Sequence, residues 1–287
     1  MGQEQSSPAT AFDVNDPDRL WRDKLSHEHV VEPWTPVDPN TPKPADHVRV
    51  VCVSDTHNTL VESLPPGDLL LHAGDFSNTG TVKNVEAVSQ WFARIRSQYQ
   101  EIVVIAGNHD LTFSPDYAEI GSHFHRRGLE DAAAAKAALQ HCIYIEDQEI
   151  ELLGLRIYGA PWQPRFFDWG FNADRGADIA QHWAKIPDNV DILMTHGPPL
   201  GYGDLTVTNQ HVGCADLLRE VVTRVKPRFH VFGHIHEGFG GWSNGETVFI
   251  NASTCNIRYK PLNAPVCFDI LPRRVSEREK KNNNDDF

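Results

Sequence analysis

Long apolar runs, paired cysteines and excess positive charge are all missing from this sequence. No stretch approaches the roughly 20 apolar residues that cross a bilayer, and the polar, acidic N-terminus does not resemble a secretory signal peptide. The five cysteines are scattered along the chain and include no C-x-x-C pair. Free thiols of this kind are typical of a reducing compartment, so we expect a cytoplasmic protein.

The formal net charge of −13 at pH 7 limits the classes of partner. Proteins that bind long nucleic acids rely on basic surfaces that replace phosphate counterions, so we expect no such partner. A small anionic substrate is compatible with this charge if bound cations supply positive charge locally. The first residues, MGQEQS, match a weak myristoylation pattern at Gly2. A single acyl chain without a second signal gives no stable membrane insertion, and the oligomeric state is left open.

Composition divides the 287 residues into three parts. Residues 1–46 are rich in Pro, Asp and Glu, which predicts a largely extended arm that Trp21 and Trp34 could pin onto the domain. Residues 47–272 carry the apolar patterns of a single catalytic domain, which is large enough to bury a core. Residues 273–287 are charged and Asn-rich, which predicts a disordered tail.

Short, nearly continuous apolar runs recur along the domain and are typical of strands buried on both faces. They occupy residues 48–53, 68–73, 102–107, 191–196 and 229–234, with similar runs at 247–252 and 266–271. Residues 150–159 alternate around Gly154, as in a hairpin. Apolar residues recur at helical spacing within 85–99 and 218–225. This alternation of strands and helices predicts an α/β sandwich with its helices outside.

Each of the first five runs ends in a polar cluster. The clusters contain, in chain order, Asp55 and His57; Asp75; Asn108, His109 and Asp110; His196; and His234 and His236. Any one of them alone could be a turn or a helix cap. Ligands of open α/β sheets bind outside the carboxyl ends of the strands, so we expect the five clusters to converge on one metal site.

The number and kind of these side chains indicate two metal ions. Setting His109 and Asp110 aside leaves two carboxylates, one amide oxygen and four imidazoles, and a tetrahedral ion takes only about four ligands. Residues two apart in an extended segment lie about 6.6 Å apart on one side, while paired ions are roughly 3.5–4 Å apart. Asp55 and His57 could therefore serve one ion, and His234 and His236 could divide between both. A carboxylate would form the bridge. Nitrogen and oxygen ligands favour Mn²⁺, with Fe, Zn or Co as alternatives, over copper or an iron–sulfur cluster.

The ordered motifs D-x-H, G-D, G-N-H-D, H and G-H-x-H, spanning residues 55–236, resemble the calcineurin-like metallophosphoesterase superfamily. Longer stretches such as VIAGNHDLTF and APWQPRFFDWGFN are similar to its MPPED (metallophosphoesterase-domain-containing) family. The resemblance implies a four-layer α/β-β/α sandwich of two mixed sheets in a single domain, with the metals at one end.

The resemblance also implies a role for each residue of the clusters. It assigns the first metal to Asp55, His57 and His236, the second to Asn108, His196 and His234, the bridge to Asp75, and action on the leaving group to His109. Some MPPED relatives carry Gly where this chain has His234, which would weaken their second metal site. Because His234 is present here, the set of seven metal ligands is complete. Protein Ser/Thr phosphatases have an arginine where this chain has Ala106, and purple acid phosphatases have a metal-binding tyrosine where it has Asn78. These departures make the pattern more similar to the cyclic-nucleotide phosphodiesterases.

We therefore expect a dinuclear metal-dependent phosphodiesterase that hydrolyses small phosphodiesters, cyclic nucleotides among them, by attack of a metal-bound hydroxide. His109 would act as general acid, although it could instead only orient Asn108. Asp110 could orient His109 or form a turn. A loop cluster of aromatic residues could stack a nucleobase or cover the core edge; it comprises Trp162, Phe166, Phe167, Trp169 and Phe171.

Two other functions remain open on the sequence alone. A nuclease of the same superfamily would need a basic groove, which the net charge of −13 disfavours. A nucleotide-binding or scaffold protein with a vestigial site would need no turnover, and the placement of surrounding groups that decides turnover is invisible in a sequence.

Overall fold

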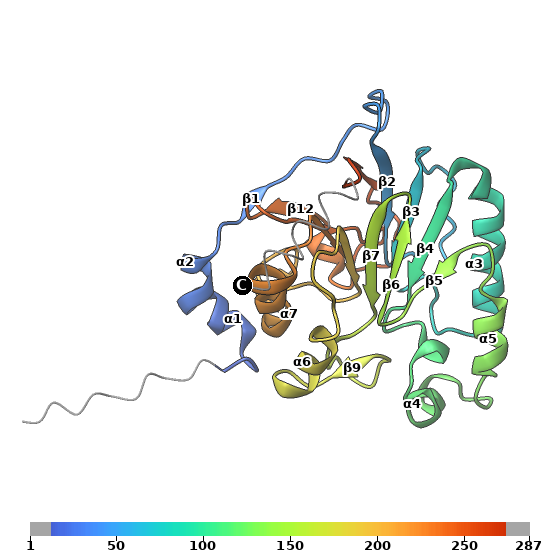
Figure 1. The fold of residues 1–287 in the computed structure, drawn as a ribbon. Coiled ribbons are helices and arrows are strands. Elements are labelled where there is room, and N and C mark those ends of the chain that lie inside the picture. Colours follow the sequence, from blue (N-terminus) through green and yellow to red (C-terminus); the bar gives the residue numbers. More distant parts are fainter. Residues whose placement is uncertain (1–12, 274–287) are drawn as a thin grey trace, which may run out of the picture.

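The computed structural model describes residues 13–273 as two facing β-sheets with helices on their outer sides (Figure 1). The first sheet has five strands in the order β14-β2-β3-β4-β5. Strands β2 to β5 are parallel and β14 is antiparallel to β2. Their bounds are β2 Val48–Val53, β3 Leu69–Ala73, β4 Glu101–Ile105, β5 Ile143–Tyr144 and β14 Val266–Ile270.

The second sheet has seven strands in the order β1-β12-β13-β11-β10-β7-β6. The four central strands β13, β11, β10 and β7 are parallel, and the other three are antiparallel to their neighbours. Their bounds are β1 Glu32–Pro33, β6 Gln148–Leu152, β7 Leu155–Ala160, β10 Ile192–Thr195, β11 Phe229–Phe232, β12 Gly240–Ser243 and β13 Val248–Asn251. A separate pair joins β8 (Gln163–Pro164) to β9 (Asn172–Ala173).

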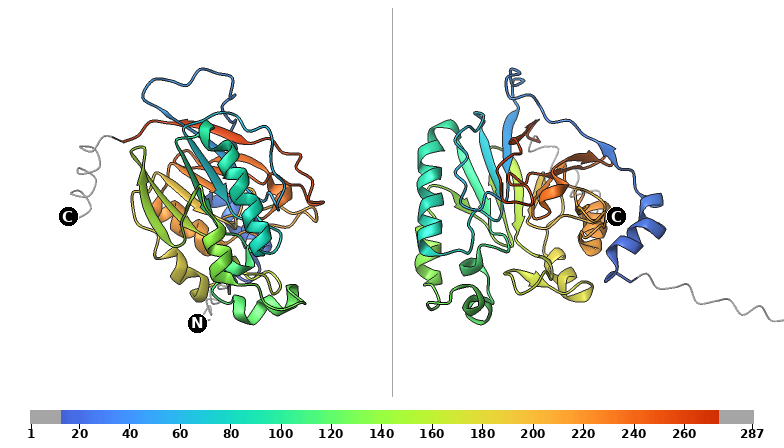
Figure 2. Two further views of the ribbon diagram at one scale, coloured as in Figure 1. Left: turned by 90° about the vertical axis from the view of Figure 1, so that its right-hand side faces the viewer. Right: turned by 180° about the vertical axis from the view of Figure 1, so that it is seen from behind.

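The alternation of side chains along each strand divides the core into layers. Val50 and Cys52 of β2 point into the layer between the sheets, whereas Val51 and Val53 point into the layer beneath α3. Helices α3 (Val82–Ile95) and α5 (Ala132–Ala138) cover the five-stranded sheet, and α6 (Ala177–Trp183) and α7 (Ala215–Glu220) cover the seven-stranded sheet. In Figure 2 the teal and green helices and the orange helix lie on opposite sides of the sheets. The predicted four-layer sandwich of two mixed sheets is confirmed.

The predicted elements correspond closely to the observed ones. Every apolar run named above forms a strand, and residues 150–159 form the β6–β7 hairpin. The helix expected within 85–99 is α3, extended by a 3-10 turn at Arg96–Gln98, and the helix expected within 218–225 is α7, continued by a π-helical turn at Val221–Val225. Helix α4 (Tyr117–Phe124) and the 3-10 turns Leu111–Phe113 and His236–Gly238 complete the domain.

The described part of the N-terminal arm is more helical than its proline content predicts. Residues 17–28 form successive helical turns, α1 (Pro17–Leu20), a π-helical turn (Trp21–Leu25) and α2 (Ser26–Glu28), which lie beside α7 in Figures 1 and 2. The local reason is that Asp16 caps the first turn and Pro17 occupies its first position.

Tertiary packing fixes the arm on the domain. Trp21 is 7% exposed and packs on Gly201, where an added Cβ would overlap its ring. Trp34 follows β1 and packs edge-on against Phe229. Gly2 and the tail at 274–287 lie outside the described residues, so their predictions stay predictions. None of the described helices is both long and apolar enough to cross a membrane.

Candidate metal centre

The five polar clusters meet at one end of the two sheets. Each follows a parallel strand, namely β2, β3, β4, β10 and β11, and the loops between them are hydrogen-bonded to one another. The backbone N–H of Asp55 donates to Gly74, and that of His57 donates to Asp75, both at 3.0 Å. Four of the seven predicted ligands adopt positive φ angles: Asp55 51°, His57 44°, Asp75 52° and His234 66°. Left-handed backbone at residues other than glycine is strained and gathers at functional sites, as it does here.

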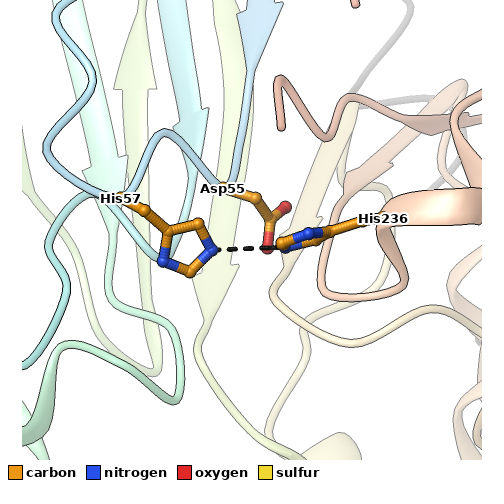
Figure 3. A group of neighbouring side chains, drawn as sticks. All are labelled: Asp55, His57 and His236. Atoms are coloured by element: carbon orange, nitrogen blue, oxygen red, sulfur yellow. Dashed lines mark hydrogen bonds and ion pairs between the residues drawn. The ribbon is translucent and has the colours of Figure 1, made fainter. Parts of the chain in front are cut away.

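Asp55, His57 and His236, which the resemblance assigns to the first metal, form one group that could hold an ion, and we call it the first half of the candidate centre (Figure 3). Their metal-ligating atoms lie within 4.8 Å of one another, and the three side chains point toward a common centre. The Oδ2 atom of Asp55 accepts the hydroxyl of Ser253 at 2.9 Å, and the N–H of His234 is shared between Oδ1 at 3.1 Å and Oδ2 at 3.0 Å. Oδ1 also faces Nε2 of His236 at 3.3 Å.

Asn108, His196 and His234, which the resemblance assigns to the second metal, also lie together, and we call them the second half of the candidate centre. The Oδ1 atom of Asn108 lies 2.9 Å from Nε2 of His196 and 2.7 Å from Nδ1 of His234. Asp75 lies between the halves. The N–H of His109 donates to its Oδ1 at 2.7 Å, and its Oδ2 faces both halves. That oxygen is 3.5 Å from Nε2 of His196 and 3.8 Å from Nε2 of His57.

These separations fit ligands that share an ion. Two ligand atoms bound to one ion at roughly 2.1 Å stand roughly 3.0–3.4 Å apart, and the Nε2 atoms of His57 and His236 are 3.2 Å apart. In two of the rings the far nitrogen already makes a hydrogen bond. Nδ1 of His196 donates to the carbonyl of Ala73, and Nδ1 of His236 donates to that of Asn256, both at 3.0 Å. Each bond directs Nε2 into the centre, which orients both rings for metal binding.

The charges of the cluster also favour cation binding. Burial would raise the pKa values of the Asp55 and Asp75 carboxyls, but His236 and His196 respectively hold them below the usual range. Burial lowers the pKa of His57 to about 4 and that of His234 to about 3, so both rings are neutral at pH 7. Burial also opposes the charged form of His196, but Asp75 raises its pKa to about 9. A cation that binds His196 would therefore displace a proton.

Two motif glycines allow the loops to approach the ligands closely. A Cβ on Gly107 would lie against Oδ1 of Asp75 and 2.6 Å from Cε1 of His196. A Cβ on Gly233 would lie against Oδ2 of Asp55. The glycines of G-N-H-D and G-H-x-H thus make space for the carboxylates rather than only forming turns.

Comparison with known proteins places the chain in a family. The family model described as calcineurin-like phosphoesterase matches residues 48–238. The chain belongs to this family. Metallophosphoesterase domain-containing protein 1 of Homo sapiens is 44% identical over 251 residues, which are 84% of this chain and 76% of that protein. UPF0046 protein C25E10.12 of Caenorhabditis elegans is 40% identical over 259 residues, 87% of this chain and 90% of that protein.

His109 lies beside the centre in a defined orientation. Its ring stacks on Trp169 with centroids 3.8 Å apart and planes at 27°, and its Nδ1 donates to the carbonyl of Asn78 at 2.9 Å. The expectation that Asp110 could orient His109 is wrong, because other groups occupy its carboxylate. Asp110 accepts the N–H of Gly107 and both the N–H and hydroxyl of Ser77. Buried there, with its pKa raised by burial to about 8, Asp110 ties two loops of the centre together.

The aromatic loop cluster divides between the two roles considered for it. Phe171 is fully buried and Trp162 packs against it edge-on, so both cover the core. Trp169 supports His109, and Phe166 lines a cavity of about 170 Å³ at the centre. The cavity is bounded by Asp75, Asn108, His109, Phe166, His234, His236, Glu237, Ile257 and Tyr259.

Tyr259 also lies at the centre, although no pattern in the sequence singled it out. Its ring lies 4.7 Å from that of His57 and 5.4 Å from that of His236, centroid to centroid. Tyr259 belongs to no metal-binding motif. The one sequence feature that could have pointed to it is its position in the segment that follows the apolar run at 247–252. A larger hollow of about 540 Å³ between Trp21 and Trp242 contains none of the predicted ligands.

Proposed function

We propose that this protein hydrolyses small phosphodiesters, cyclic nucleotides among them, at a centre of two divalent metal ions. Asp55, His57 and His236 hold one ion, and Asn108, His196 and His234 hold the other. The observation that carries the proposal is the position of Asp75, whose Oδ2 faces a histidine of each half. Mn²⁺ is the ion we expect, with Fe, Zn or Co as alternatives, because the ligands are nitrogen and oxygen atoms.

When bound, two such ions lower the pKa of a water molecule and draw charge from the phosphoryl oxygens. The chain supplies the remaining chemistry. Asp55 and Asp75 provide negative charge at neutral pH, and the neutral rings of His57 and His234 provide lone pairs.

His109 protonates the departing alkoxide in this mechanism. Nδ1–H is committed to the Asn78 carbonyl and the ring is held flat against Trp169, so Nε2 is the atom that can give a proton. His109 also lines the cavity in which the substrate must lie. A fixed donor beside the reacting bond contributes typically about 10²–10⁴-fold to the rate of proton-dependent steps.

The cavity favours a diester over a monoester. None of the described residues that line it is Lys or Arg, so the second negative charge of a monoester would meet no basic side chain. Its volume of about 170 Å³ suits a small ester, whereas a polynucleotide would need an extended basic groove. The net charge of −13 supports the same choice.

The test is hydrolysis by metal-stripped protein before and after addition of Mn²⁺. The substrates are bis(p-nitrophenyl) phosphate, p-nitrophenyl phosphate and the 2′,3′- and 3′,5′-cyclic forms of AMP, with Asp75→Ala as the inactive control. We expect diester cleavage that requires the metal and disappears in the variant. If the protein binds two ions but turns over no substrate, the site is a nucleotide-binding platform and the catalytic proposal fails.

A further inference from the structure

The hollow between Trp21 and Trp242 has no part in the proposed reaction. It measures about 540 Å³, and among the described residues it shares only Glu237 with the cavity at the metal centre. Sites for small molecules usually measure roughly 300–1,000 Å³. The hollow therefore has room for a small molecule of its own.

Two glycines of one short segment position the tryptophan rings. Gly201 and Gly203 adopt positive φ angles of 87° and 62°. A Cβ on Gly201 would overlap the ring of Trp21, and a Cβ on Gly203 would lie 2.7 Å from Cζ3 of Trp242. Each ring thus packs on a backbone that only glycine makes accessible, and both rings line the hollow.

The rest of the wall is largely apolar and partly open to solvent. Phe239 adds a third aromatic ring, and Val31, Leu205 and Val207 are exposed side chains that line the hollow. Val207 is 68% exposed. Exposed apolar side chains that cluster around a hollow mark binding surfaces.

The charge of the lining is negative. None of the described residues that line the hollow is Lys or Arg. Asp204 is fully buried and accepts the Nδ1–H of His211 at 2.7 Å, so its carboxylate would balance a proton on that ring. Glu237 accepts the N–H of Val207 through Oε1 at 3.0 Å, and no described group is hydrogen-bonded to its Oε2. Glu237 thus leaves negative charge without a partner at the edge of the hollow.

Aromatic rings beside carboxylates suit an organic cation. A ring face attracts a positive charge, most strongly when the ring is Trp, and quaternary ammonium groups are recognised in this way. The two carboxylates would repel an anion, and a neutral molecule would gain nothing from either of them. We propose that the hollow between Trp21 and Trp242 binds a small organic cation that carries a quaternary ammonium group, independently of the proposed phosphodiesterase reaction.

The first test is equilibrium dialysis of labelled choline against the protein, with unlabelled competitors. The matched competitor is 3,3-dimethylbutan-1-ol, which has the shape of choline with a carbon atom in place of the charged nitrogen. We expect choline to bind about 5- to 30-fold more tightly than the alcohol, the size of a partly desolvated cation–π contact. Equal affinities for the two, or no detectable binding of choline, would overturn the proposal.

Variants of the lining place the cation in the hollow. Trp242→Leu should weaken choline binding by about 5-fold or more, whereas Trp242→Phe keeps a ring and should retain most of it. Glu237→Gln removes charge but keeps the acceptor for Val207, and it should weaken binding of choline by about 2- to 5-fold without affecting the alcohol. Glu246→Gln is the charge control, because Glu246 pairs with Lys226 and does not line the hollow. Unchanged choline binding in both Trp242→Leu and Glu237→Gln would overturn the assignment.

Dialysis of metal-free and of Mn²⁺-loaded protein separates the hollow from the metal centre. We expect the same choline affinity in both forms, and loss of choline binding on addition of Mn²⁺ would place the cation at the centre instead. Tighter binding of a trimethyllysine peptide than of choline would assign the hollow to a protein partner and overturn the small molecule. None of these measurements requires hydrolysis, so failure of the phosphodiesterase proposal and failure of the cation site are distinguishable.

Discussion

Replacing Asp75 with Asn should separate the metal-binding role of this carboxylate from any structural role. In the metal-free protein one buried neighbour of Asp75 repels its carboxylate and another attracts it. The carboxylate of Asp55 lies within 4.8 Å of that of Asp75, and the repulsion between the two is about 3 kcal/mol at an effective dielectric constant near 20. His196, 3.5 Å away, attracts it by about 5 kcal/mol on the same scale. Because these effects nearly cancel, we expect the metal-free variant to lose only about 1–2 kcal/mol of unfolding free energy.

Mn²⁺ should stabilise the wild-type protein much more than the variant. At a free metal concentration of about 100 times the dissociation constant, each ion adds about 2.7 kcal/mol, so two add about 5.4 kcal/mol. For a chain of this size that corresponds to a rise in Tm of about 10 °C. In the proposed centre the Asp75 carboxylate serves both ions, so Asp75→Asn should lose most of that rise.

Thermal unfolding followed by circular dichroism, with EDTA or with MnCl₂, measures both quantities. Asp204→Asn is the matched control, because Asp204 is also fully buried but bonds His211 and Gly213 away from the centre. That variant should lose stability equally with and without metal and keep the Mn²⁺-dependent rise. A full Mn²⁺-dependent rise in Asp75→Asn would refute the bridge, and a loss above about 5 kcal/mol without metal would show that the carboxylate is structural.

Three further predictions concern the proton donor, a close approach and the pH dependence. His109→Ala should slow hydrolysis of alkyl diesters by about 10²–10⁴-fold but barely affect p-nitrophenyl esters, whose leaving group needs no proton. Trp169→Leu should show the same selectivity more weakly in the same kinetic assay. Equal losses of rate on both kinds of ester would contradict the role of His109 as an acid. Gly233→Ala places a methyl group against Asp55, so elemental analysis should find that one of the two proposed ions is lost, and full metal content would show that the close approach does not matter. Burial lowers the pKa of His230 to about 3, so below pH 6.5 the unfolded chain binds a proton that the folded chain does not. This residue should therefore contribute about 2 kcal/mol to the fall in stability between pH 7 and pH 5, so urea unfolding should find that fall about 2 kcal/mol smaller in His230→Leu than in the wild-type protein.

The sequence by itself determined the strands and the polar residues that meet at their carboxyl ends. A strand buried on both faces is a continuous apolar run, as in β2 and β3, and that pattern is local. The carboxyl ends of parallel strands share one edge, so the positions of Asp55, Asp75 and Asn108 after their strands were enough to predict that they meet. The resemblance then supplied the division into two halves, which the observed separations fit.

Only the tertiary structure decided what surrounds those residues. The sequence did not show that Trp169 rather than Asp110 fixes His109, or that Gly201 is the residue on which Trp21 packs. Nor did it show that Tyr259 stands over His57, a contact across about 200 residues of chain (259 − 57 = 202). The physical reason is common to all three. Periodicity and motif spacing report the local backbone and the face that a residue presents, whereas the partner across a loop depends on how distant segments pack together.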